Sequence, residues 1–117
     1  MRKKLICTIL AMYFSTCPAH AAEKVVSCEV YSNNQPAYTG TCLFIPEAGG
    51  SFVLSHTVKG KPLVGEVTDI SVTIVEKGVA EVRGLTKRGN NSRWGEAKRS
   101  QNNKACWEGA DFKVCAR

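Results

Sequence analysis

The chain has 117 residues, six cysteines and a formal net charge of +6. This length leaves no room for a second domain beside the first, and no internal repeat or low-complexity tract is visible. The sequence also lacks the glycine-rich phosphate loops and spaced metal ligands that mark several large classes of enzyme.

Residues 1–21 predict a cleaved export signal. Three basic side chains precede an apolar run at 5–14, and Ala19-His20-Ala21 then places small residues at the two positions that a signal peptidase reads. The run is about half as long as a bilayer-spanning helix, and no second one follows. We therefore expect a soluble mature protein that begins near Ala22 and resides in the bacterial periplasm or outside the cell, with no transmembrane segment.

A second interpretation of the leader makes Cys17 the lipid-bearing first residue of a lipoprotein. Such signals usually carry leucine three positions before the cysteine and Gly or Ala directly before it. Here Phe14, Ser15 and Thr16 stand before the cysteine. The residues therefore favour a conventional signal peptide, followed by a single domain at 22–117.

The mature sequence predicts an all-β domain, because turn-forming clusters interrupt it every eight to twelve residues and the pieces between are rich in Val, Ile, Thr and aromatics. Alternating side chains predict strands at 25–31, 39–45, 51–58, 66–75, 79–85, 105–107 and 112–115, with turns at 33–36, 46–50, 59–62 and 76–78. Segment 86–104 departs from this pattern. It is either a weak strand around 93–98 between two loops or one long functional loop.

The expected fold is a small antiparallel β-barrel or sandwich of about six to eight short strands with little helix. Loss of the leader removes two cysteines and leaves Cys28, Cys42, Cys106 and Cys115, which predict two disulfides. Such bonds suit an oxidising compartment outside the cytosol.

Four cysteines allow three connectivities. Cys28 and Cys42 flank a midpoint at Gln35, and Cys106 and Cys115 flank one next to Gly109, so each pair could sit opposite across its own hairpin. Loop entropy alone favours a long bridge, worth nearly 5 kcal/mol against roughly 3 for each local one. We predict local pairing because it requires no assumption about strand neighbours.

Neither metal binding nor catalysis is expected. A zinc site would need more than the single histidine that survives cleavage, His56, and no Cys-x-x-Cys spacing exists. His56 lies in a predicted strand on the face of Phe52 and Leu54, where a packed core histidine is common. A small hydrolase remains an alternative, using His56 or two carboxylates. Its acidic candidates are Glu47, Glu66, Asp69, Glu76, Glu81, Glu96, Glu108 and Asp111.

The positive charge of the mature chain belongs to its C-terminal third. Residues 22–82 hold four basic and seven acidic side chains, whereas 83–117 hold nine and three. Such a region can attract polysaccharide, lipid head groups or an acidic protein surface, although a merely solvated surface has the same composition. Export makes nucleic acid an unexpected partner.

The candidate binding residues fall within this basic third. They combine tryptophan and arginine, which are enriched at interface hot spots, with lysine. An alternative role for the two tryptophans is to fill a small core next to the second disulfide. The candidates are Ser92, Arg93, Trp94, Lys98, Arg99 and Trp107.

The same segment resembles small exported bacterial inhibitors of C-type lysozyme. Asn91-Ser92-Arg93-Trp94 is similar to that family's Ser/Gly-rich loop running into Ala-Arg-Tyr, and residues 106–110 are somewhat similar to its later aromatic-Trp-x-Lys-Gly stretch. The resemblance covers about twenty residues and implies a disulfide-containing β-barrel. Here the repeated Gly-Ser is missing and Glu108 replaces the lysine. Of the serine and lysine that enter the lysozyme cleft, only the serine has a counterpart, Ser92.

These observations favour an exported, non-enzymatic protein, needing no cofactor, that binds a protein partner through the basic third. An inhibitor or immunity-type protein is the corresponding function. The alternative is an envelope-associated binder of anionic glycans or lipids, whose affinity would fall steeply with salt because exposed charges are screened over about 8 Å at physiological ionic strength.

Overall fold

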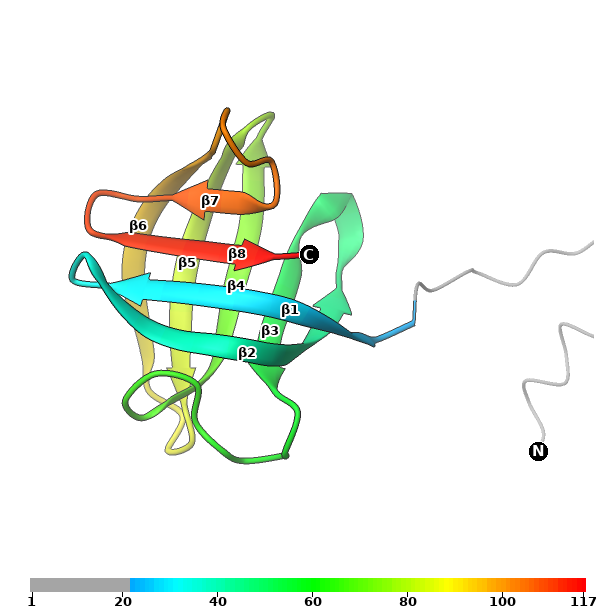
Figure 1. Ribbon diagram of the computed structural model, residues 1–117, viewed down its shortest axis with the longest axis vertical. Helices are drawn as coiled ribbons and strands as arrows, with labels where there is room; N and C mark the ends of the chain where they lie inside the picture. The colour runs from blue at the N-terminus through cyan, green and yellow to red at the C-terminus, as the bar shows by residue number, and fades with distance from the viewer. Residues whose placement is uncertain (1–21) are drawn as a thin grey trace, which may run out of the picture.

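The computed structural model describes residues 22–117, which form a closed antiparallel barrel of eight strands (Figure 1). The all-β class predicted from the sequence is confirmed. The expected export signal and Cys17 lie outside the described residues. The elements are β1 Lys24–Ser32, β2 Gln35–Pro46, the short 3-10 turn η2 Ala48–Gly50, β3 Phe52–His56, β4 Val67–Glu76, β5 Val79–Thr86, β6 Asn91–Arg99, β7 Cys106–Glu108 and β8 Phe112–Ala116.

Each strand pairs with the next one in the sequence, and β1 pairs with β8 to close the barrel. In Figure 1, β7, β8, β1 and the beginning of β2 cross in front of the steeply inclined β3, β4, β5 and β6. The long β2 belongs to both layers, because only its residues 42–46 pair with β3. The strands thus wrap an interior between two crossed layers.

The interior contains the apolar side chains of the alternating strands. Successive strand residues point to opposite faces, so every second position reaches the core. Val72 and Val82 face each other across β4 and β5, and both are fully buried. The other large, fully buried side chains are Val30, Leu54, Ile70, Val114, Cys42 and Cys115.

The β1–β2 turn is tighter than predicted and lies earlier in the chain. Asn33 and Asn34 have φ values of 54° and 61°. Left-handed conformations at both central residues are the requirement of a type I′ hairpin turn, which asparagine tolerates better than other residues with a side chain. Gln35 and Pro36, which we predicted to lie in the turn, are the first residues of β2.

Replacing Asn34 by alanine is expected to lower the free energy of unfolding by about 1 kcal/mol, because alanine lacks the local hydrogen bonding that eases the left-handed conformation. Asn34→Gly is the matched control and should leave the stability unchanged or raised. Urea unfolding followed by tryptophan fluorescence measures both. Equal losses in the two variants would contradict this account of the turn.

Both local disulfides are present. Cys106 lies directly opposite Cys115 in the β7–β8 pair, with 4.0 Å between their Cα atoms. The Cys28–Cys42 bridge is diagonal, with a Cα separation of 6.0 Å, because Cys28 lies opposite Gly40. Direct opposition was therefore a wrong prediction for this pair, since the hairpin turns before the midpoint of the two cysteines.

Two strand boundaries also differ from the prediction. β3 ends at His56, and residues 57–66 form a connection to β4 in place of the predicted continuation to Val58. In the atypical segment 86–104, the strand alternative is correct, and β6 is longer than the expected 93–98. The candidate binding residues 92–94, 98 and 99 therefore lie on a strand and not in a loop.

Candidate functional site

β6 separates the candidate binding residues instead of gathering them. About 20 Å of strand lies between Arg93 and Arg99. The Arg93 side chain is 65% exposed, and its Nε donates to Glu81 Oε2 at 2.6 Å. Arg83 reaches the same carboxylate at 3.4 Å. Arg93 thus extends from the outer wall of the barrel, and its Nε is the guanidinium nitrogen that Glu81 binds.

Trp94 packs toward the interior. Its ring meets Phe112 edge to face at a centroid distance of 5.7 Å. A Cβ atom on Gly84 would lie only 2.9 Å from the indole Nε1, so the indole occupies space left by the missing side chain. The hydroxyl of the exposed Ser92 donates to the Gly84 carbonyl at 3.5 Å. Trp94 therefore has a packing role, while Ser92 stays accessible beside it.

Trp107 is a core residue, with 2% of its surface exposed. The exposed Arg99 guanidinium lies over its ring at 4.7 Å from the centroid. A partner could not touch this indole without displacing Arg99. The alternative role that we considered, a tryptophan filling the core near the second disulfide, is thus the correct one for Trp107.

Lys98 and Arg99 line a groove of about 760 Å³, which we call the β6 groove. It exists because β7 has only three residues and pairs with β6 at just these two positions. The chain then turns away toward β8, so that among the described residues no second strand flanks β6 before Lys98. The remaining lining residues are Glu96, Ser100, Gln101, Asn102, Glu108, Gly109 and Ala110.

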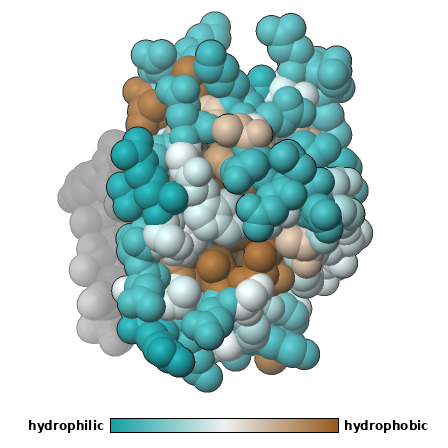
Figure 2. Space-filling view, turned by 90° about the vertical axis from the view of Figure 1, so that its left-hand side faces the viewer, coloured by the Kyte–Doolittle hydropathy of each residue, from teal (hydrophilic) through white to brown (hydrophobic). Residues whose placement is uncertain are grey.

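Within the part of the chain that the structure describes, residues 91–93 and 95–97 of β6 have strand partners on β5 only, and Trp94, at the register shift, has none. The N–H of Arg99 donates to the Gly78 carbonyl next to β5, at 3.0 Å. Because N–H groups alternate sides along a strand, the N–H of Glu96 points to the open edge. Figure 2 shows the side of the barrel where the β1–β2 and β7–β8 turns lie, and apolar atoms there are visible in a recess between polar side chains.

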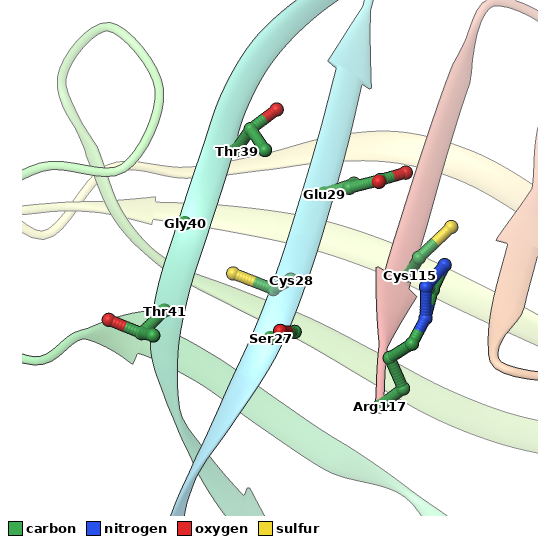
Figure 3. Close-up of a pocket in the computed structure, with 8 residues that line it drawn as sticks. All are labelled: Ser27, Cys28, Glu29, Thr39, Gly40, Thr41, Cys115 and Arg117. Atoms are coloured by element: carbon green, nitrogen blue, oxygen red, sulfur yellow. The ribbon is translucent and has the colours of Figure 1, made fainter.

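A polar hollow of about 270 Å³ lies on the outer face of β8, β1 and β2 (Figure 3). Hydroxyl groups of Ser27, Thr39 and Thr41 line it together with Glu29 and Arg117. None of the candidate binding residues predicted from the sequence lines this hollow, although the disulfide cysteines Cys28 and Cys115 do. The only sequence signal for this hollow is the alternation of polar residues along β1 and β2, which any exposed sheet face shows.

His56 is the last residue of β3 and is half-buried. Its Nδ1 accepts a hydrogen bond from the Val58 N–H at 2.9 Å, which leaves Nε2 as the ring nitrogen for any further contact. The four cysteines of the described part are all in disulfides. Burial raises the pKa of Asp69 above its ordinary value.

Within residues 22–117, no three side chains of His, Cys, Asp or Glu are placed together so that they could hold a metal ion. In the same range, no helix has the length and apolar character needed to cross a membrane. Comparison of the chain with family models, curated proteins and solved structures yields no match.

Proposed function

We propose that this chain is an exported, non-enzymatic binding protein that takes up an extended segment of a protein partner along the open edge of β6. The observation that carries the proposal is the missing strand partner of residues 91–97, next to the β6 groove. An inhibitor or immunity-type role fits such a surface.

Strand addition uses groups that β6 already presents. The open edge is roughly 20 Å long, enough for a partner strand of six or seven residues. Backbone hydrogen bonds supply affinity in this mode of binding, and side-chain contacts on alternate residues supply specificity. The N–H of Glu96 is one donor that such a strand would meet, and the β6 groove would receive the end of that strand beside Lys98.

Charge indicates an acidic partner segment. Arg93 is held by Glu81 through Nε, so its terminal nitrogens can reach a carboxylate of the partner. Lys98 is exposed further along the same strand. Two copies of this edge would bring like charges together, and the register shift between Val82 and Arg83 marks a local irregularity in the pairing. A different protein with acidic residues fits this edge better than a second copy does.

Other features support the exported and non-catalytic parts of the proposal. Two disulfides in so small a domain are typical of oxidising compartments. His56 is engaged through Nδ1 by its own loop, and the cysteines are oxidised. The resemblance of residues 91–94 to the loop of C-type lysozyme inhibitors favours an inhibitor, with Ser92 on the open edge. Trp94 would support that edge from inside through Phe112.

Replacing both Arg93 and Lys98 by alanine is expected to weaken binding of a captured periplasmic partner at least about a hundredfold, because charge pairs at an interface are worth about 1.5 kcal/mol or more each. The partner is captured with the oxidised wild-type protein, identified by mass spectrometry and titrated calorimetrically. Lys77→Ala with Lys104→Ala is the control, since both lysines are exposed and neither belongs to residues 91–97 or lines the β6 groove. Equal affinity of the two double variants would overturn the proposal.

Strand addition itself is tested at Glu96. Glu96→Pro removes the edge N–H without touching the β5–β6 ladder, whereas Glu96→Ala removes the same side chain and keeps the N–H. We expect the proline variant alone to lose partner binding, while circular dichroism shows that both variants are folded. Retention of binding by the folded proline variant would contradict strand addition.

A further inference from the structure

The outer wall of β1, β2 and β3 carries an apolar patch that the β6 site does not use. Leu43 pairs with Val25 on β1, and Ile45 pairs with Val53 on β3. These side chains point outward, because the positions between them on β2 face the core. The Val25 side chain is 61% exposed. Isolated exposed valines are ordinary, whereas a contiguous patch marks an interaction surface.

A cleft of about 500 Å³ opens over this patch, and we call it the lysine cleft. Leu43 and Ile45 lie on its floor. Its rim includes three exposed lysines from two different connections, Lys59 and Lys61 after β3 and Lys87 after β5. Among the described residues, none of the three is in an ion pair. The further lining residues are Glu23, Ser55, His56, Thr57, Gly60, Thr68 and Asp69.

Exposed apolar side chains border the lysine cleft. Val58 is 56% exposed and precedes Lys59, and Leu85 is 39% exposed and lies opposite Asp69. With Val25, three of the four large exposed hydrophobic residues of the described chain are next to this one cleft. A cationic rim next to exposed apolar groups is complementary to the surface of an anionic bilayer, where phosphate groups lie above acyl chains.

The acidic residues of the cleft limit how deeply an anion can enter. Asp69 is half-buried on β4 and forms no ion pair within the described chain. Its carboxylate would repel a phosphate at the floor and thereby hold it at the lysine rim.

We propose that the lysine cleft binds the phosphate head group of an anionic phospholipid at a membrane surface, with Val25 and Val58 toward the acyl chains. Lys59, Lys61 and Lys87 supply the positive charge. This site shares no residue with the β6 groove or the open edge of β6. It therefore adds a membrane contact to the partner site, and either can exist without the other.

Vesicle co-sedimentation with the exported, oxidised protein tests the proposal, using phosphatidylcholine vesicles with and without phosphatidylglycerol. We expect binding only to the vesicles that contain phosphatidylglycerol. A lysine near an anionic surface contributes about fivefold, so Lys59→Gln with Lys87→Gln should lower the partition coefficient about 25-fold. Lys77→Gln with Lys104→Gln changes the net charge equally and should lower it less than twofold. Equal losses in both pairs, or no binding of the wild type, would overturn the proposal.

Two further variants separate the parts of the cleft. Val25→Ser with Val58→Ser keeps the charge and should also weaken vesicle binding, because it removes apolar contacts with the acyl region. Asp69→Asn should strengthen binding, since it removes the carboxylate that repels the phosphate. Unchanged binding in the valine variant, or weaker binding in the Asp69 variant, would contradict the assigned orientation. Thermal unfolding of every variant shows whether the fold is intact.

Discussion

Alanine at Gly109 is expected to destabilise the protein by about 3 to 5 kcal/mol, the cost of losing a buried phenylalanine from a core. A Cβ atom there would overlap the ring of Phe112, which is 6% exposed and packs against Trp94. The turn cannot move aside easily, because the Gly109 N–H donates to the Phe112 carbonyl at 2.8 Å. The ring must therefore leave its place.

A double-mutant cycle tests this explanation. Gly109 does not have a positive φ, so alanine itself meets no backbone strain. In a Phe112→Ala background, Gly109→Ala should cost less than about 1 kcal/mol, because the ring that it would displace is already absent. Urea unfolding gives the four free energies. Additive losses would show that the overlap with Phe112 is not the cause.

Removing the Cys28–Cys42 disulfide by two alanine substitutions is expected to cost about 4 kcal/mol. Loop entropy accounts for about 3 kcal/mol of this loss for a closure of this length. Lost packing accounts for the rest, since both cysteines belong to the core. Loss of the Cys106–Cys115 bridge, whose residues are buried to a similar degree but which closes a shorter loop, should cost slightly less. The loss of both disulfides together should cost about as much free energy as the whole stability of a small domain.

Urea unfolding of the two double-alanine variants and of the variant without all four cysteines measures these losses. We expect the third protein to be largely unfolded at 37 °C, as judged by circular dichroism. Treatment of the wild type with dithiothreitol should produce the same state. A larger loss for Cys106–Cys115 than for Cys28–Cys42 would contradict the ranking by loop length.

The strands that sequence alternation predicts are those whose interior positions carry large aliphatic side chains, such as Ile70 and Val72 on β4. β6 lacks this pattern because aromatic rings from elsewhere fill the barrel next to it. The interior positions of β6 are Gly95 and Ala97, which are too small to fill the space next to them. The Phe112 ring of β8 occupies part of that space, since one of its atoms lies 3.9 Å from a Cβ built on Gly95. Such compensation between distant residues leaves no local signal.

The candidate site, like the strands, can be predicted only in part from the sequence. Composition identifies the basic third of the chain, yet it does not show that Arg93 lies outside while Trp94, at the register shift between β5 and β6, packs inside next to Gly95. The diagonal Cys28–Cys42 bridge depends on where the hairpin turns, which pairing by midpoints cannot supply. The lysine cleft joins Lys59 and Lys87, far apart in the sequence, because the barrel brings the connections after β3 and β5 together. Only the three-dimensional structure relates these residues.

The pairing of β1 with β8 makes the order of strands a ring. Ser27 and Arg117 exchange two backbone hydrogen bonds, of 3.0 and 2.9 Å, so the first and last strands are hydrogen-bonded to each other as consecutive strands are. All other strand pairs form between consecutive segments, which require only short loops to close. Folding can therefore begin at any hairpin, and a circularly permuted chain with new ends in a surface turn retains every strand neighbour.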